Sequence, residues 1–289
     1  MTNGIANSVI GVLGCGYVGQ QLLAQPFLAQ QSWHSSSWHT VYNHRPDSGF
    51  TAVAFSLDEP DSWHSLPSHA DCLVLTIPPG YQDVELETQR LFRWCQWMAV
   101  NRSALKRLIY LSTIGVYSTE SGVYNENDHC QPDGLRGQLR LDTEQLLRKY
   151  FQCTAIRCGG IYGAGSNIVD KLLAGDPVYR GNKAVYRIHV DDLVGIISQL
   201  ISQPWQYKAV NAVDDRSASQ DEVIDWLMLQ SEFAARVGQT LSFHDKRLDN
   251  PVTHQVTAPK RVISNSLLLE GLGYRLKYPS YQQGLGVLF

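Results

Sequence analysis

A glycine-rich turn near the start of the chain limits the fold more than any other feature of the sequence. The pattern G-C-G-Y-V-G at 14–19 follows an apolar run at 9–13 and opens a helix-like stretch at 17–23. Between a strand and a helix, the first glycine makes a tight turn, the second admits a pyrophosphate, and the third lets the helix pack on the strand. The start of the helix adds unpaired N–H groups for phosphates. The pattern predicts a dinucleotide-binding turn rather than a purely structural one, with contacts from Gly14, Gly16, Tyr17, Val18 and Gly19.

Short apolar runs alternate with helix-like segments through the first 160 residues. The Ser-rich segment 31–39 is predicted to be a loop. Alternation of this kind is typical of a parallel sheet with helices on its faces, joined by right-handed crossovers. We therefore predict an α/β fold, a Rossmann-type doubly wound parallel sheet. The predicted strands are 9–13, 40–43, 52–55, 72–77, 107–111 and 154–157, and the predicted helices are 17–23, 84–100 and 139–151.

The later part of the chain predicts a smaller lobe. It contains an apolar helix candidate at 188–201, a strand at 209–213, and a Ser-x-x-Glu capping box at 219–222 that opens a helix to about 237. A chain of 289 residues is long enough for one large core with such a lobe attached. We expect a dinucleotide-binding domain at 1–165, to which parts of 185–215 return, and a mixed α/β substrate lobe at 166–289.

Charge and composition exclude several classes of partner. The chain has 24 basic and 27 acidic residues, so we expect neither nucleic-acid nor anionic-membrane binding. Its longest apolar runs have the length of strands, which predicts no membrane span, and the first residues lack a secretory signal, which predicts a cytoplasmic protein. The six cysteines are not spaced as metal ligands, so we expect reduced thiols and no metal site.

Further segments occur in an order that is known from one enzyme family. After the glycine turn come L-S-T-I-G-V-Y at 111–117, I-R followed by I-Y-G-A-G between 156 and 165, I-H-V-D-D-L at 188–193, V-N-A at 210–212 and K-R-V-I-S-N at 260–265. In these segments the chain resembles the extended short-chain dehydrogenase/reductase family, the NAD(P)-dependent epimerases and dehydratases of nucleotide sugars. The likeness covers nearly the whole chain.

The resemblance implies where a nicotinamide dinucleotide binds. It assigns the floor of the cofactor site to the end of the fourth predicted strand, and the nicotinamide side to the ends of the fifth and sixth. Open α/β sheets bind their ligands at these carboxyl ends. The implied residues are Thr76, Ile77, Pro78, Leu111, Ser112, Gly159 and Gly160.

The choice between NAD and NADP depends on the region after the second predicted strand. NAD-preferring sites place an acidic residue there to bind the ribose 2′-hydroxyl, whereas this chain has Asn43 and, two residues later, Arg45. A guanidinium pairs bidentately with a phosphate, so these residues favour NADP. The alternative is that Arg45 is a solvated loop cation.

The catalytic pair of the family is replaced. The family uses a Tyr-x-x-x-Lys pair, and alignment on Pro132 and Glu144 places Arg136 at the tyrosine and Arg140 at the lysine. Arginine stays protonated and cannot act as the proton shuttle. The resemblance leaves Thr113 at the family's Ser/Thr position. Arg140 is expected to hold the nicotinamide ribose and Arg136 an anionic substrate group, the alternative being that each is a surface cation.

Another acid must therefore serve if the chain is an enzyme. Tyr117, Tyr124 and Tyr162 lie in segments that the resemblance places near the cofactor, and we take Tyr117 as a catalytic candidate. The alternative is that each tyrosine is an aromatic wall. In this family the histidine that matches His189 holds the fold beneath the site, so we interpret it as structural.

Two functions compete at this point. The first is an NAD(P)-dependent oxidoreductase or epimerase that transfers a hydride to or from a nucleotide sugar or similar hydroxylated small molecule. The second is a non-catalytic or regulatory NAD(P)-binding protein that has lost the tyrosine, and a protein-interaction scaffold has least support. The resemblance also implies a homodimer through the helices at 84–100 and 139–151.

Overall fold

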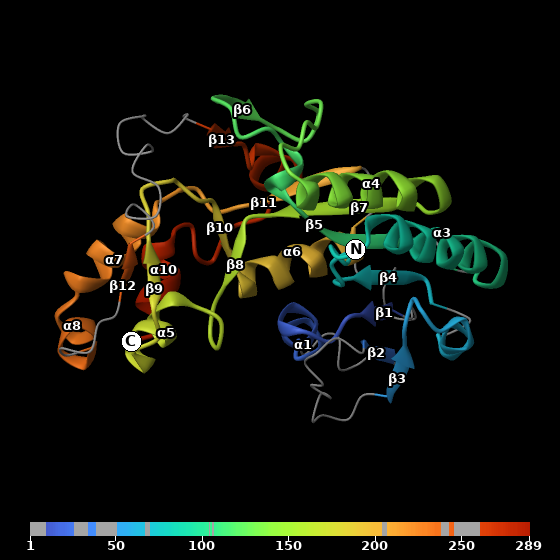
Figure 1. The fold of residues 1–289 in the computed structure, drawn as a ribbon, viewed down its shortest axis with the longest axis horizontal. Coiled ribbons are helices and arrows are strands. Elements are labelled where there is room, and N and C mark those ends of the chain that lie inside the picture. The colour runs from blue at the N-terminus through green and yellow to red at the C-terminus, as the bar shows by residue number, and fades with distance from the viewer. Residues whose placement is uncertain are drawn as a thin grey trace. The chain divides into compact units, whose positions relative to one another are not determined.

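The structure is a computed structural model (Figure 1), which describes residues 10–25, 34–38, 51–66, 70–103, 105, 107–203, 207–237, 243–245 and 261–289. Up to the end of the seventh strand the elements are β1 (Ile10–Leu13), α1 (Tyr17–Leu23), β2 (His34–Trp38), β3 (Thr51–Phe55), η1 (Pro60–Ser65), β4 (Cys72–Leu75), α3 (Val84–Asn101), β5 (Arg107–Thr113), η2 (Ile114–Val116), β6 (Gly122–Tyr124), α4 (Leu135–Tyr150) and β7 (Cys153–Cys158). The later elements are β8 (Gly160–Tyr162), α5 (Ile168–Ala174), β9 (Val178–Arg180), β10 (Arg187–His189), α6 (Val190–Ser202), β11 (Ala209–Ala212), α7 (Gln220–Met228), α8 (Ser231–Val237), β12 (Phe243–Asp245), β13 (Arg261–Ile263), η4 (Leu267–Gly271) and α10 (Tyr281–Gly286).

A central sheet of seven strands organises the fold. Its strand order is β11-β7-β5-β4-β1-β2-β3, and each pairing from β3 to β5 is parallel. The direction of winding reverses between β1 and β4, which is the feature that defines a doubly wound sheet. The predicted α/β fold is confirmed. Ligands of such sheets bind at the carboxyl ends of the strands where the winding reverses, and here β1 ends in the glycine turn.

The chain forms two compact units. The first comprises 1–119, 126–157 and 194–210, and the second comprises 120–125, 158–193 and 211–289. The first unit has a core in which aromatic rings from the sheet and α3 meet, as in the edge-to-face pair of Phe55 and Trp94. The second unit has its own core, in which Phe233 and Tyr281 are buried. Each unit therefore has an apolar interior of its own.

Three predictions about local structure are corrected. Residues 34–38 lie in β2 and not in a loop, because the strand pairs with β1 on one side and β3 on the other despite its serines. The apolar segment at 188–201 begins as β10, which pairs with β8, before α6 starts at Val190. The helix predicted from 220 to 237 is interrupted after Met228, where the N–H of Gln230 bonds the Leu227 carbonyl in a tighter turn.

Helix caps follow the sequence more closely. Ser219 and Glu222 form the predicted capping box at the start of α7, each side chain accepting a hydrogen bond from the backbone of the other residue. The helix α4 starts at Leu135, earlier than its apolar pattern indicates, since Leu135, Arg136 and Gln138 in its first turn are exposed. Within the described part of the chain, we find no helix with the length and apolarity needed to cross a bilayer.

A buried ionic network joins α4 to two strands of the first unit. The carboxylate of Glu144, with no exposed surface, accepts hydrogen bonds from Arg157 on β7 at 2.9 and 3.2 Å and from Arg148 at 3.0 Å. The Ser112 hydroxyl at the end of β5 donates to the same carboxylate at 2.5 Å, and Arg157 donates to the Tyr117 phenol at 2.8 Å. Contact with Glu144 raises the pKa of Arg157, although burial alone lowers it. The network keeps both charges paired inside the unit.

Removing one partner of this network is expected to destabilise the fold. Arg157→Met removes a cation that pairs with the buried Glu144 carboxylate. Breaking a buried ion pair in this way lowers the free energy of unfolding by about 3 kcal/mol or more. Urea denaturation measures the change. Arg93→Met, at an exposed arginine of α3, is the control and should change the free energy of unfolding by less than about 0.5 kcal/mol. Equal unfolding midpoints for the two variants would contradict the assignment.

Candidate functional site

The first glycine of the turn has a backbone that only glycine adopts without strain. Gly14 has φ of +105°, and a Cβ there would overlap the hydroxyl of Thr76 and lie 2.8 Å from Ile77 Cγ1. Positive φ values are sterically costly for residues with a side chain. Gly14 therefore makes the tight turn between β1 and α1, directly against the segment that follows β4.

The other two glycines meet opposite surroundings. A Cβ on Gly19 would overlap the Gly14 carbonyl oxygen, so α1 packs against the end of β1 only because no side chain intervenes. A Cβ on Gly16 would meet nothing within 4 Å. The three positions thus combine a left-handed turn, an open approach and a close helix–strand contact, which are the three requirements of a pyrophosphate-binding turn.

Polar contacts hold the turn in place. The Thr76 hydroxyl lies 2.7 Å from the Gly14 carbonyl oxygen and 3.2 Å from that of Leu13, and it donates to this pair of acceptors. The Gln20 side chain donates to the Cys15 carbonyl at 3.1 Å. The Thr76 hydroxyl and the Gln20 side chain donate only to carbonyl groups. They therefore orient the turn without using any of its N–H donors. Tyr17 and Val18 form the first turn of α1, as predicted.

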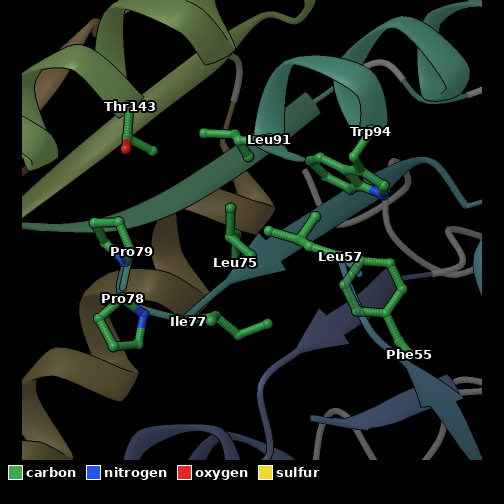
Figure 2. A pocket seen from close by; sticks show the side chains of 9 residues that line it. All are labelled: Phe55, Leu57, Leu75, Ile77, Pro78, Pro79, Leu91, Trp94 and Thr143. Atoms are coloured by element: carbon green, nitrogen blue, oxygen red, sulfur yellow. The ribbon is translucent and has the colours of Figure 1, made fainter. Parts of the chain in front are cut away.

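A narrow apolar cavity lies beside the end of β4 (Figure 2). Ile77 and Pro78, two of the implied cofactor residues, line it from the segment after β4. Sequence reasoning missed the opposite wall, which comes from Phe55 and Leu57 around the end of β3. The alternation of the apolar residues Phe55 and Leu57 at the end of β3 was the sequence signal that could have indicated this wall. The full lining is Phe55, Leu57, Leu75, Ile77, Pro78, Pro79, Leu91, Trp94 and Thr143.

Arg140 is bound to the end of β5. Its guanidinium donates to the Leu111 carbonyl and, at 3.3 Å, to the Tyr110 phenol. Burial lowers the pKa of Arg140, but contacts with Tyr110 and Tyr81 outweigh it and raise the pKa. Arg140 is therefore a fixed cation beside two of the implied nicotinamide-side residues, Leu111 and Ser112. This position is incompatible with the alternative of a solvated surface charge.

Arg136 meets a tyrosine that sequence reasoning overlooked. Its guanidinium carbon lies 5.0 Å from the ring centroid of Tyr81, a cation–π contact. Tyr81 follows the double proline after β4, and its distance in sequence from Arg136 hides this contact. Arg136 itself is exposed. The structure thus brings a phenol from the loop after β4 to Arg136, one helical turn before Arg140 on α4.

Thr113 and Tyr117 occupy different environments. Thr113 is half-buried where β5 ends, and its oxygen accepts the Gly115 N–H at 3.1 Å while its own proton remains to be donated. Tyr117 is only 1% exposed and its phenol accepts from Arg157, so it belongs to the Glu144 network. Ser112 is engaged by the same network. Of these three side chains, Thr113 is the one with exposed surface at the end of β5.

The remaining candidates lie outside this cluster or outside the described residues. Asn43 and Arg45 are not among the described residues, and β2 ends at Trp38, well before them. Gly159 and Gly160 belong to the second unit. The Gly159 N–H bonds the Ala212 carbonyl at 3.0 Å, and a Cβ there would lie 2.7 Å from the Tyr186 carbonyl oxygen.

The other aromatic candidates of the second unit have structural contacts. His189 accepts the Asp191 N–H at 3.1 Å at the start of α6, and its ring centroid lies 4.0 Å from that of Tyr278. Burial lowers the pKa of His189. Tyr162 is buried, with its phenol 3.4 Å from the Ser280 carbonyl. The Tyr124 phenol lies 3.4 Å from the Glu120 carbonyl. These contacts support the interpretation of His189 as structural.

The second unit contains a large cavity with a cationic lining. Its volume is about 660 Å³, within the range of small-molecule sites. Two of its cations are held in place: Arg180 pairs with Asp221 at 3.0 Å, and Arg187 donates to the Ala218 carbonyl at 2.7 Å. Lys171 and Lys183 are exposed. The residues that line it, among those described, include these four cations and no carboxylate, so an anionic ligand fits this cavity.

Comparison with known proteins agrees with this architecture. No family model matches the chain, and no curated protein matches it significantly. Among solved structures, a conserved protein of unknown function from Silicibacter pomeroyi matches 98% of each chain with a TM-score of 0.73 and 22% identity. A putative NAD-dependent epimerase/dehydratase from Methylobacillus flagellatus matches 97% of each chain (TM-score 0.70, 21% identity). The dTDP-glucose 4,6-dehydratase of Streptomyces venezuelae, solved with NAD, matches 96% of this chain and 95% of its own (TM-score 0.75, 18% identity).

The chain shares its fold with these proteins, among them a short-chain dehydrogenase/reductase superfamily protein from Agrobacterium tumefaciens. This confirms the fold that the sequence resemblance implied. The glycine turn and the ends of β4 and β5 lie at the carboxyl edge of the sheet, where ligands of such sheets bind, and Arg140 on α4 is hydrogen-bonded to the Leu111 carbonyl near the end of β5. Within the described part of the chain, we find no group of His, Cys, Asp and Glu residues arranged to hold a metal ion.

A buried carboxyl group gives the second unit a pH-dependent stability. Burial raises the pKa of Asp214 from 3.8 to about 7, although the Arg187 guanidinium lowers it. Between about pH 4 and pH 7 the unfolded chain has lost this proton while the folded chain retains it, so stability falls as pH rises through this window. The free energy of unfolding of Asp214→Asn should therefore rise by about 2 kcal/mol relative to that of the wild type between pH 5 and pH 8.

Urea denaturation at a series of pH values measures this difference. Asp176→Asn, at an exposed carboxylate of the same unit, is the control. A constant difference in unfolding free energy between Asp214→Asn and the wild type from pH 5 to pH 8 would show that the Asp214 carboxyl is not held protonated in the fold.

Proposed function

We propose that the protein is an NAD(P)-dependent oxidoreductase of the epimerase/dehydratase type, acting on a nucleotide sugar or a similar hydroxylated, phosphate-bearing small molecule. The observation that carries the proposal is the glycine turn. Gly14 and Gly19 are confined to glycine by the surrounding protein atoms, whereas the space at Gly16 is open and suits the close approach of a diphosphate. A merely structural turn does not require this open side.

The residues around the turn fit the rest of a dinucleotide. Gly14, Gly16 and the start of α1 would hold the pyrophosphate. Arg140, fixed at the Leu111 carbonyl, is placed to hydrogen-bond the nicotinamide ribose, the task of the family's lysine. When bound, the nicotinamide would supply or accept a hydride. Solved structures of similar fold contain NAD, which supports this assignment.

The cationic cavity of the second unit supports the substrate class. Four basic side chains line about 660 Å³, and Arg180 and Arg187 are preorganised by hydrogen bonds. Guanidinium and ammonium groups are the side chains that recognise phosphate oxygens. Structures of similar fold were solved with UDP-glucose and UDP-glucuronic acid. A nucleoside diphosphate sugar combines the required negative charge with a hydroxyl group that a nicotinamide can oxidise.

The second candidate, a non-catalytic NAD(P)-binding protein, rests on one observation. Arginine occupies the position of the catalytic tyrosine, and the guanidinium of Arg136 does not transfer protons at working pH. Under this alternative the cofactor binds but no substrate is turned over. The two candidates thus agree on the cofactor and differ in chemistry.

The setting of the activity is part of the proposal. We place the protein in the cytoplasm, where its six free cysteines stay reduced. A homodimer through α3 and α4 is supported by the partly exposed Phe92 on α3, whose ring contacts that of Tyr150 on α4.

Loss of the open side at Gly16 should abolish cofactor binding without unfolding the protein. Gly16→Val puts a branched side chain where the diphosphate approaches, and the NADPH dissociation constant should rise at least tenfold in a fluorescence titration. Gly134→Val is a matched control, because Gly134 also precedes a helix with open space around its Cβ position and should bind NADPH as the wild type does. Wild-type affinity in Gly16→Val would remove the basis of the proposal.

The preference for NADP is tested at Arg45. If its guanidinium pairs with the 2′-phosphate, Arg45→Ala should weaken NADPH binding by about 1.5–3 kcal/mol, the range for a hydrogen bond to a charged group, and leave NADH binding unchanged. Isothermal titration with both cofactors measures the two affinities. An equal loss for NADH and NADPH would rule out the NADP preference.

A further inference from the structure

One phenol lies at the place where the catalytic pair is missing. Tyr81, in the loop after β4, has the Arg136 guanidinium over its ring at 5.0 Å. The two arginines are one helical turn apart on α4, at the positions of the family's tyrosine and lysine. Tyr81 is half-buried, so its side chain is held yet retains access to solvent. The loop after β4 thus supplies a phenol next to α4, at the place where the family's tyrosine is expected.

The groups around Tyr81 are anchored to the end of the sheet. Arg140 is fixed by the Leu111 carbonyl, two residues before Thr113. The start of α4 is held against the turn after β5, since a Cβ on Gly137 would overlap the Gly115 carbonyl oxygen. Because β4 and β5 are parallel neighbours, their carboxyl ends meet at one edge. Tyr81 after β4, Thr113 at the end of β5 and Arg140, bound to the Leu111 carbonyl, therefore belong to the same edge of the sheet.

We propose that Tyr81 is the catalytic acid–base residue of this protein, with Arg136 over its ring and Arg140 on the next turn of α4 as the cations that position it. The inference rests on the proposed oxidoreductase function and names the proton donor that this function requires.

The proposed step is the reduction of a carbonyl group, with a reduced nicotinamide as the second reactant. Hydride passes from nicotinamide C4 to the carbonyl carbon of the substrate, and the C=O π electrons move to oxygen. The Tyr81 hydroxyl gives its proton to that oxygen, leaving an alcohol, an oxidised nicotinamide and a phenolate that water reprotonates. In the reverse direction the phenolate takes the proton of the alcohol. Thr113 has a hydroxyl proton left to donate to the same oxygen.

The other tyrosines of the first unit near this edge are less suited to the role. Tyr117 is 1% exposed and hydrogen-bonded to Arg157. Tyr110 has no exposed surface, and burial raises its pKa to about 12 despite the nearby Arg140. A proton donor must reach its substrate to within hydrogen-bond distance. Tyr81 has exposed surface, whereas these two are enclosed by the protein.

Kinetics of Tyr81→Phe test the proposal. General acid catalysis contributes about 10²–10⁴-fold, so kcat should fall by at least 100-fold in NADPH-dependent reduction of UDP-4-keto sugars or small ketones, while the NADPH dissociation constant changes less than twofold. The matched control is Tyr150→Phe, which removes the phenol oxygen of another half-buried tyrosine in the same unit and should keep the wild-type kcat. A kcat for Tyr81→Phe within threefold of the wild type overturns the role of Tyr81 and leaves the oxidoreductase function intact.

A second variant separates the two proposals when no substrate in the panel is turned over. Arg136→Tyr with Arg140→Lys restores the family's pair on α4. In the Tyr81→Phe background it should recover at least tenfold in kcat, because a phenol returns beside the cofactor. If the Arg136→Tyr/Arg140→Lys variant turns over a substrate and the wild type does not, the role of Tyr81 is overturned. Cofactor binding with turnover by neither protein overturns the oxidoreductase function and supports the non-catalytic alternative.

Discussion

The close contact between the start of α1 and the end of β1 is the constraint on which the rest of this site depends. Gly19 sits against the Gly14 carbonyl with no room for a methyl group, so the helix starts immediately after the strand. The turn is held from the other side by the Thr76 hydroxyl, which comes from the segment after β4. β1 and β4 are the neighbours between which the winding of the sheet reverses. The position of the turn is thus set by backbone packing and by strand pairing together.

The packing of the helix α4 does not depend on the side chain at position 136. The helix keeps its place through Gly137 on the Gly115 carbonyl and through the buried Glu144 network, neither of which involves Arg136. Arg136 is exposed and makes its contact with a loop residue. The fold therefore accepts different side chains at position 136 while the packing of α4 is retained.

Much of the architecture was predictable because its signals are local. Apolar runs such as 72–75 and 107–111 fill strands that are buried on both faces, and the glycine turn and the Ser219 capping box depend on residues close in sequence. The strand β2 was not predictable in this way. His34–Trp38 is rich in serine and becomes a strand because β1 and β3 supply hydrogen-bond partners on both sides. The register of a central strand reflects its neighbours more than its own composition.

By itself, the sequence determined the α/β class and the position of the glycine turn, since both depend on residues close together in the chain, and the replacement of the catalytic pair stays a prediction from the resemblance. Only the tertiary structure decided which side chains share a site. Tyr117, the last residue of the motif at 111–117, is buried against Arg157, whereas Tyr81, more than fifty residues from Arg136 in the chain, has that guanidinium over its ring. The physical reason is that parallel strands bring their carboxyl ends to one edge whatever the length of chain between them.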